Sequence, residues 1–369
     1  EMDDLELAGN LIVAGTVAAD MTFADGADII TASAGTNNVR VGVNTGNSIQ
    51  SGGNENTFVG DEAGTATTTG DANTGIGFSA LVANTTGSRN TAVGRRALVA
   101  NTEGVDNDAF GRHALEANTT GSQNVAIGRG TLATSQTADD NTAVGFGAGL
   151  LVTTGIRNTL IGSLSGDALT DADFNVSLGY ATLSSDTLGS HNTAIGYAAL
   201  FTQNFTTATD AFNTAVGSNA GLSVTTGVSN TLIGATAGDA LTDADNNIAV
   251  GAESLSSDTL GSRSIAIGRS ALQNQNFTTA TDTYNTAVGY AAGNAVTTGI
   301  RNVIVGGVAG DSLTDADYNT VVGFDALGTD TLGSASVAIG YQALERQNFT
   351  TATTTYNVAV GFNAGENVT

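Results

Sequence analysis

A five-residue motif ending in glycine recurs along almost the whole chain. NTAVG occurs at residues 90–94, 141–145, 213–217 and 285–289, and near-copies such as NTLIG at 158–162 fill the intervals. Fourteen of the seventeen steps between successive motif glycines are 17 residues long, and three are 21. The motif glycines are residues 60, 77, 94, 111, 128, 145, 162, 179, 196, 217, 234, 251, 268, 289, 306, 323, 340 and 361. A short period of this constancy predicts a solenoid in which each repeat stacks on the previous one.

A longer period lies above the first. Gly145, Gly217, Gly289 and Gly361 are 72 residues apart, which is three steps of 17 and one of 21. We therefore expect a four-coil unit repeated from about residue 141, within a repeat shaft covering residues 38–369. Residues 1–37 are expected to form a β-rich segment that leads into this shaft.

The composition of one coil indicates strands rather than helices. Seventeen residues are too few for a helix pair, whereas two short strands and two turns fit. Thr, Val and Ile favour extended backbone, and Gly and Asn favour turns. With 49 Gly and 5% aromatic residues, a conventional core of large side chains is not expected. The sequence predicts an all-β fold, a parallel β-roll solenoid of 17- and 21-residue coils.

Both faces of the motif strand are apolar. The residue before the motif glycine is apolar in all eighteen copies, and the residue before that is Ala in eleven. Because side chains alternate along a strand, we expect the first of these positions to face the coil interior and the Ala position to face outward. A strand with two apolar faces is covered on both sides, which predicts association with further copies of the chain.

The motif Asn and Gly are expected to be structural. The Asn side chains either form a ladder of hydrogen-bonded amides from coil to coil or serve turn chemistry alone. The representative positions are Asn90, Gly94, Asn141, Gly145, Asn213, Gly217, Asn285 and Gly289.

The charge and the hydropathy exclude two classes of partner. The chain contains no Lys and has a formal net charge of −24, so we expect no binding to nucleic acid or to anionic membranes. No run of about 18 apolar residues occurs, so we expect no membrane insertion by this chain. The absence of Cys excludes disulfides and thiolate metal sites.

An acidic segment repeats three times at the 72-residue spacing, at 166–175, 238–247 and 310–319. Each copy contains a D-x-D-x-N pattern, and oxygen ligands at alternate positions suit Ca²⁺. The complete EF-hand loop is absent, so a solvated acidic turn is the alternative, and a structural Ca²⁺ is the only cofactor considered. The candidate ligands are Asp171, Asp173, Asn175, Asp243, Asp245, Asn247, Asp315, Asp317 and Asn319.

The 21-residue coils contain an insert, QNFTTATD or QNFTTATT, that is expected to bulge outward as a loop. Its aromatic and amide side chains could contact a sugar or a partner chain, or the Phe could fill a gap in the roll. The candidate binding residues are Gln203, Asn204, Phe205, Gln275, Asn276, Phe277, Gln347, Asn348 and Phe349.

No catalytic constellation is evident. His113 and His191 are the only histidines and lie in different coils. We therefore expect a protein that is not an enzyme.

The repeats resemble those of the head domains of trimeric autotransporter adhesins, most clearly in SIAIG at 264–268 and SVAIG at 336–340. Related NTAIG-type repeats occur in phage tail fibres and marine surface proteins. The coils here, at 17 or 21 residues, are longer than the usual repeat of the family. The resemblance implies a left-handed β-roll with three chains around one axis, which is a homotrimeric fibre.

The resemblance also implies a role. It suggests a non-enzymatic fibre or adhesin at a cell surface, whose partners are copies of itself, also end to end, and a glycan or cell-surface receptor. A phage tail fibre on a virion is the alternative, and an ice-binding or enzymatic solenoid is a third class.

Overall fold

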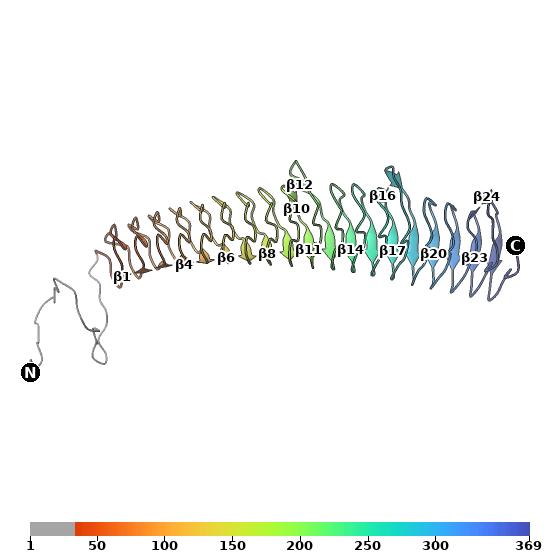
Figure 1. Cartoon of the computed structure of the whole chain (residues 1–369), viewed down its shortest axis with the longest axis horizontal. Coiled ribbons are helices and arrows are strands. Elements are labelled where there is room, and N and C mark those ends of the chain that lie inside the picture. The colour runs from red at the N-terminus through yellow and green to blue at the C-terminus, as the bar shows by residue number, and fades with distance from the viewer. Residues whose placement is uncertain (1–33) are drawn as a thin grey trace, which may run out of the picture.

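The computed structural model describes residues 34–369, which form a long, gently curved rod with the first and the last described residues at opposite ends (Figure 1). Every regular element is a β-strand, and successive coils stack along the rod axis. The predicted all-β solenoid of 17-residue coils is confirmed. Residues 1–33 of the β-rich segment expected over residues 1–37 lie outside the described residues.

One continuous sheet of nineteen strands runs the length of the rod. Its strands are β1 (Val39–Val41), β2 (Thr57–Val59), β3 (Thr74–Ile76), β4 (Thr91–Val93), β5 (Asp108–Phe110), β6 (Val125–Ile127), β7 (Thr142–Val144), β8 (Thr159–Ile161), β9 (Val176–Leu178), β11 (Thr193–Ile195), β13 (Thr214–Val216), β14 (Thr231–Ile233), β15 (Ile248–Val250), β17 (Ile265–Ile267), β19 (Thr286–Val288), β20 (Val303–Val305), β21 (Thr320–Val322), β23 (Val337–Ile339) and β25 (Val358–Val360).

Three two-stranded ladders accompany the inserts, which project from the side of the rod opposite the long sheet (Figure 1). They pair β10 (Gly189–Ser190) with β12 (Thr209–Asp210), β16 (Gly261–Ser262) with β18 (Thr281–Asp282), and β22 (Gly333–Ser334) with β24 (Thr353–Thr354).

All pairing is parallel and in register with the repeat. Thr91 of β4 lies opposite Asp108 of β5, and the amide of Thr91 donates to the carbonyl of Asn107 at 2.8 Å. Gly94 donates in the other direction, to the carbonyl of Ile76, also at 2.8 Å. Each coil therefore bonds only to the coils directly before and after it, as in other solenoids.

Most coils contain one strand, not the two that the sequence predicts. The rest of the coil turns tightly, because three positions per coil, besides the motif glycine, adopt left-handed backbone. In the coil of β4 these are Arg89, Arg96 and Leu98, with φ between 49° and 61°. Such residues cannot continue a strand, so a second long sheet does not form.

The motif glycine is required by its backbone. Gly94 has φ +140°, and a Cβ there would lie 2.5 Å from the carbonyl oxygen of Gly111 in the next coil. Any side chain would clash with the neighbouring backbone, which explains why the same residue recurs at each coil.

The interior of the coil is on the side opposite to the one predicted. The central strand residue, such as Ala92, is fully buried, whereas Val93 before the glycine faces outward. The space facing Ala92 is occupied by Leu98, which is also fully buried. The coil is too narrow for two large side chains, so the strand residue that lies opposite the Leu is Ala. Burying each such Leu contributes about 1.5–3 kcal/mol.

Where glycine stands in place of that Leu, a larger side chain of the same coil or of a neighbouring coil fills the space. A Cβ on Gly149 or on Gly166 would lie 2.8 Å from a δ-carbon of Leu160, the central residue of β8. Large side chains from the same coil or from a neighbouring coil thus occupy the space that small residues leave, as close packing requires.

A buried hydroxyl layer divides the apolar interior into two clusters, one ending at Ala172 and the other beginning at Leu183. Ser165 donates to the hydroxyl of Ser177 at 2.8 Å, and the hydroxyls of Ser177 and Thr182 are 2.6 Å apart. All three side chains are fully buried, and each has a partner.

Candidate functional site: the outer face of the sheet and its flanks

The outer face of the long sheet presents an unbroken apolar row. It consists of the residue before each motif glycine, and none of these side chains is buried. The exposed fraction is 43% at Leu178, and Ile76 and Ile127 are similar. We call this row, with the parallel row at the first residue of each strand, the outer strip.

The second row of the outer strip is Thr in ten coils. Val or Ile replaces Thr in seven, including Val176 and Ile248, and Asp108 is the one charged member. Along residues 57–360, the outer strip therefore has almost no charge on a strongly anionic molecule.

Two columns of larger side chains flank the outer strip. In the column after the motif glycine, the rings of Tyr180 and Tyr197 are nearly parallel with centroids 5.7 Å apart, and Arg95 lies 5.9 Å from the ring centroid of Phe78. An Arg that lies over a ring of the same chain gains a cation–π contact, which stabilises the column within one chain. Arg129 over Phe146 is a second example.

The other flanking column precedes the motif Asn and contains both arginine and acidic side chains. Arg89 bonds to Asp106 in the next coil through two nitrogens, at 2.6 and 2.8 Å. This hydrogen bond lowers the pKa of Asp106 and raises that of Arg89. Farther along the column, the ring of His191 lies between Phe174 and Phe212, with centroids 4.9 and 5.1 Å away.

The amide ladder of the motif Asn is present. Asn90 accepts from both the backbone N and Nδ2 of Asn107, each at 3.1 Å, and its own Nδ2 donates to the carbonyl of Gly104. Asn141 repeats this pattern, whereas the Nδ2 of Asn213 and of Asn285 donates to a Gln of the insert. The ladder is buried and holds adjacent coils together.

A second ladder was not predicted. Asn101 donates to Asn84 and accepts from Asn118, both at 2.8 Å, and all three are fully buried. The signal in the sequence is Asn at three successive 17-residue steps outside the motif.

The acidic turns do not converge on a cation. Asn175 is a fully buried member of the motif ladder, and its Oδ1 already accepts two bonds from Asn192. The carboxylates of Asp171 and Asp173 accept from Thr154 and from the amide of Ile156 in the preceding coil.

The later copies repeat this arrangement. Asp243 and Asp245 accept from Thr226 and Val228, and Asp315 and Asp317 accept from Thr298 and Ile300. Asn247 and Asn319 are buried ladder members. Within residues 34–369 no group of three His, Cys, Asp or Glu side chains could hold a metal ion.

The inserts bury the side chains that the sequence offers as binding residues. Gln203, Gln275 and Gln347 are fully buried, and Phe205 and Phe277 are almost so. Phe349 is partly exposed, and only Asn204, Asn276 and Asn348 face solvent, with each Oδ1 accepting from a Thr hydroxyl. The alternative in which the Phe fills a gap in the roll agrees with these positions.

Three half-buried carboxylates follow the 72-residue period on the side of the rod. Burial raises the pKa of Asp167, Asp239 and Asp311. Asp167 Oδ1 accepts a hydrogen bond from Ser184 at 2.5 Å, whereas the buried Oδ1 of Asp239 has no partner among the described residues.

The two histidines remain far apart in the chain and pair separately. Nδ1 of His113 lies 2.7 Å from a carboxylate oxygen of Glu116, and that of His191 lies 3.1 Å from Asp210. The fold does not bring the two pairs into one site.

A groove of about 600 Å³ opens on the side of the rod beside Tyr180 and Tyr197. No sequence motif marks it as a site. The signal that could have found it is two successive tyrosines in one column, next to alanines at the following position.

The sequence matches no protein-family model, and no curated protein is significantly similar to it. The described residues contain no helix with the length and hydropathy needed to cross a bilayer. The class that the fold defines is the parallel β-solenoid.

Proposed function

We propose that this chain is a structural rod that associates with copies of itself along the outer strip and forms a surface fibre with a role in attachment. The single observation that carries the proposal is the unbroken apolar row on the outer face of the sheet. Monomeric soluble proteins rarely expose apolar patches larger than a few hundred Å².

The size of the outer strip supports an interface. Eighteen coils at about 4.8 Å give a length of roughly 85 Å, and three residues across give a width of about 10 Å. The strip therefore offers roughly 850 Å² per chain, which is close to one side of a standard protein interface.

The period of the outer strip favours another copy as the partner. Its side chains repeat at the spacing of the coils, and a second copy presents the same spacing over the same length. Charge also agrees, because the many acidic side chains lie off the strip and stay solvated when strips meet. The resemblance in the motifs favours three chains in closed symmetry.

The function that follows is mechanical rather than catalytic. A stiff rod made of many identical coils separates its two ends by a fixed distance, which suits a stalk or adhesin outside a cell. The solvated anionic surface keeps such a fibre soluble and opposes lateral aggregation.

Native mass spectrometry with light scattering tests this proposal. We expect the unmodified chain to be an oligomer, and we expect Ile195→Asp combined with Ile267→Asp to give a folded monomer, since both side chains point outward from the sheet. Thr206→Asp at the exposed tip of an insert is the matched control and should leave the oligomer intact.

Positions on the other side of the strand do not test assembly. Ala194 and Ala266 are fully buried inside the coil, so a charge there would disrupt the fold itself. A monomeric, folded, unmodified chain would refute the proposal.

A further inference from the structure

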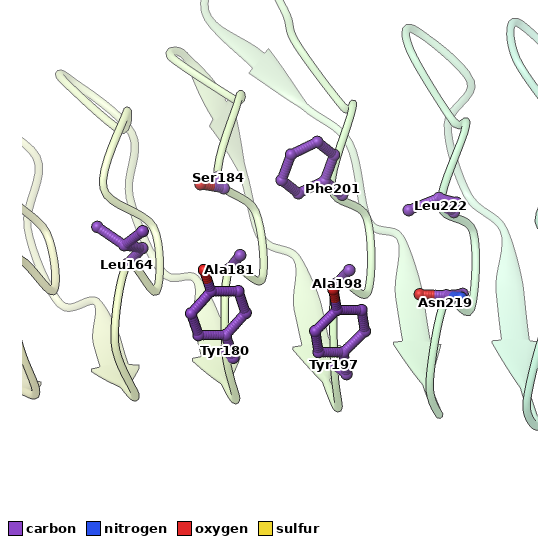
Figure 2. A pocket seen from close by; sticks show the side chains of 9 residues that line it. All are labelled: Leu164, Tyr180, Ala181, Ser184, Tyr197, Ala198, Phe201, Asn219 and Leu222. Atoms are coloured by element: carbon purple, nitrogen blue, oxygen red, sulfur yellow. The ribbon is translucent and has the colours of Figure 1, made fainter.

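The groove on the side of the rod has a flat aromatic wall. Tyr180 and Tyr197 are 52% and 57% exposed, and their ring planes differ by 8°. Figure 2 shows the two rings side by side and face-on, with Phe201 and Ser184 on the opposite side of the groove. The rings thus form one continuous apolar surface that follows the rod axis.

The floor of the groove is low because the residues there are small. Ala181 and Ala198 follow the two tyrosines, and Ser184 stands in a column that contains Phe201 and Leu222 in the next two coils. Toward the N-terminus the groove continues as a smaller one of about 270 Å³, which includes Gly130 and Gly147, shares Leu164 and is also lined by Glu116 and Arg129. A chain-like ligand along the axis would lie over several coils.

The chemistry of the lining favours a neutral ligand. The residues of the larger groove include no charged side chain, and the net charge of −24 repels anions. The lining offers no carboxylate to a cation, and Oδ1 of Asp167, which lies next to the groove, already accepts from Ser184. Polar groups are present in Ser184, Asn219 and the two phenol hydroxyls, which can exchange hydrogen bonds with hydroxyls of a ligand.

The spacing favours a polymer of ring units. The ring centroids are 5.7 Å apart, which is close to the length of one sugar in an extended β-linked glycan. The face of a phenol ring is electron-rich and packs well against the C–H groups on the flat face of a pyranose.

We propose that this groove binds a neutral, extended, β-linked glycan chain, with successive sugars stacked on Tyr180 and Tyr197. The inference goes beyond the proposed assembly, because the groove lies beside the outer strip and each chain contains the whole of it.

Binding is tested with the full chain and with cellohexaose and chitohexaose as probes, by titration calorimetry. Maltohexaose tests for binding of an α-linked glycan. Heparin tests for an anionic ligand, and oligolysine tests for a cationic one. We expect Tyr180→Ala and Tyr197→Ala each to weaken binding by about two- to tenfold, and the double variant to weaken it further. Tyr290→Ala is the matched control, since Tyr290 is 61% exposed in the same column but forms no ring pair with another described residue.

A second variant fills the groove without removing a ring. Ser184→Phe places in one coil the residue that the next coil already has at Phe201, and it should abolish binding with little change in the melting temperature. Mass measurement of each variant separates loss of binding from loss of assembly.

Three results would overturn the proposal. They are no binding of either β-linked probe, binding that survives the double tyrosine variant, or preferential binding of oligolysine that the double variant removes.

Discussion

Gln203 donates a hydrogen bond of 2.6 Å from Nε2 to Oδ2 of Asp186, and both side chains are fully buried. The other carboxylate oxygen accepts from the backbone amides of Gly189 and Phe205, at 3.0 and 3.2 Å. The same arrangement recurs with Asp258 and Asp330. One buried carboxylate therefore anchors each insert to the coil before it.

We predict that Asp186→Ala destabilises the rod by about 2–4 kcal/mol, because it leaves three buried donors without an acceptor. Asp210→Ala is the control, since Asp210 forms only an exposed pair with His191 and should cost little. Denaturant unfolding measures both, and equal effects of the two variants would contradict the anchoring role.

The hydroxyl layer gives a second prediction. Ser177→Ala alone should destabilise by about 1 kcal/mol, because Ser165 and Thr182 each lose a partner. Combining it with Ser165→Ala and Thr182→Ser copies the next unit, which has Ala237, Ala249 and Ser254 at these positions. We expect the triple variant to be at least as stable as the unmodified chain in the same assay, and a strictly additive loss would argue against the layer acting as one network.

The raised pKa of Asp239 predicts that the stability of the fold depends on pH. Burial raises its pKa above 3.8, so its contribution to stability is fully present below that pH and is lost as the pH rises through the folded-state pKa. Asp239→Asn should therefore raise the melting temperature at about pH 7 and leave it unchanged at about pH 3.

Asp106→Asn should change the stability at neutral pH in the opposite direction. Arg89 lowers the pKa of Asp106, so the native carboxylate stabilises above 3.8 and this variant should be slightly less stable at neutral pH. A melting temperature for Asp239→Asn that falls at neutral pH would show the sign to be wrong.

Calcium is predicted to have no effect on the melting temperature. The Oδ1 of Asn175 is used by the ladder, and each neighbouring carboxylate bonds to the coil before it. Thermal unfolding with chelator and with added calcium should superimpose, and a chelator-induced drop restored by calcium would revive the metal site.

Small-angle scattering should show an elongated particle. Eighteen coils correspond to a rod of roughly 85 Å. A particle of globular dimensions would be incompatible with the fold, and the width of the particle reports how many rods lie side by side.

The period of the sequence was sufficient to predict the solenoid and the coil length, because each depends on residue type at a fixed spacing, and it offered the amide ladder as one of two roles for the motif Asn. The face of the strand that points into the coil was not predictable in this way. Both Val93 and Ala92 are apolar, so alternation alone leaves two equal choices, and the choice depends on the distance across the coil.

That distance is fixed by left-handed residues that sequence propensity does not mark. Leu98 has φ 49°, although Leu does not usually favour this conformation, and the turn brings its side chain opposite Ala92. The buried hydrogen bonds of Gln203 could not be predicted for a similar reason, since a single sequence does not show whether a Gln is exposed or buried.

The confinement of hydrogen bonds to neighbouring coils has an evolutionary consequence. A 72-residue unit can be gained or lost by unequal recombination, and the newly joined coils meet through the same contacts as before. Each such event changes the length of the rod by about 19 Å, four coils at about 4.8 Å. The number of units therefore sets the length of the rod, and selection can change this length without changing the contacts that stabilise each coil.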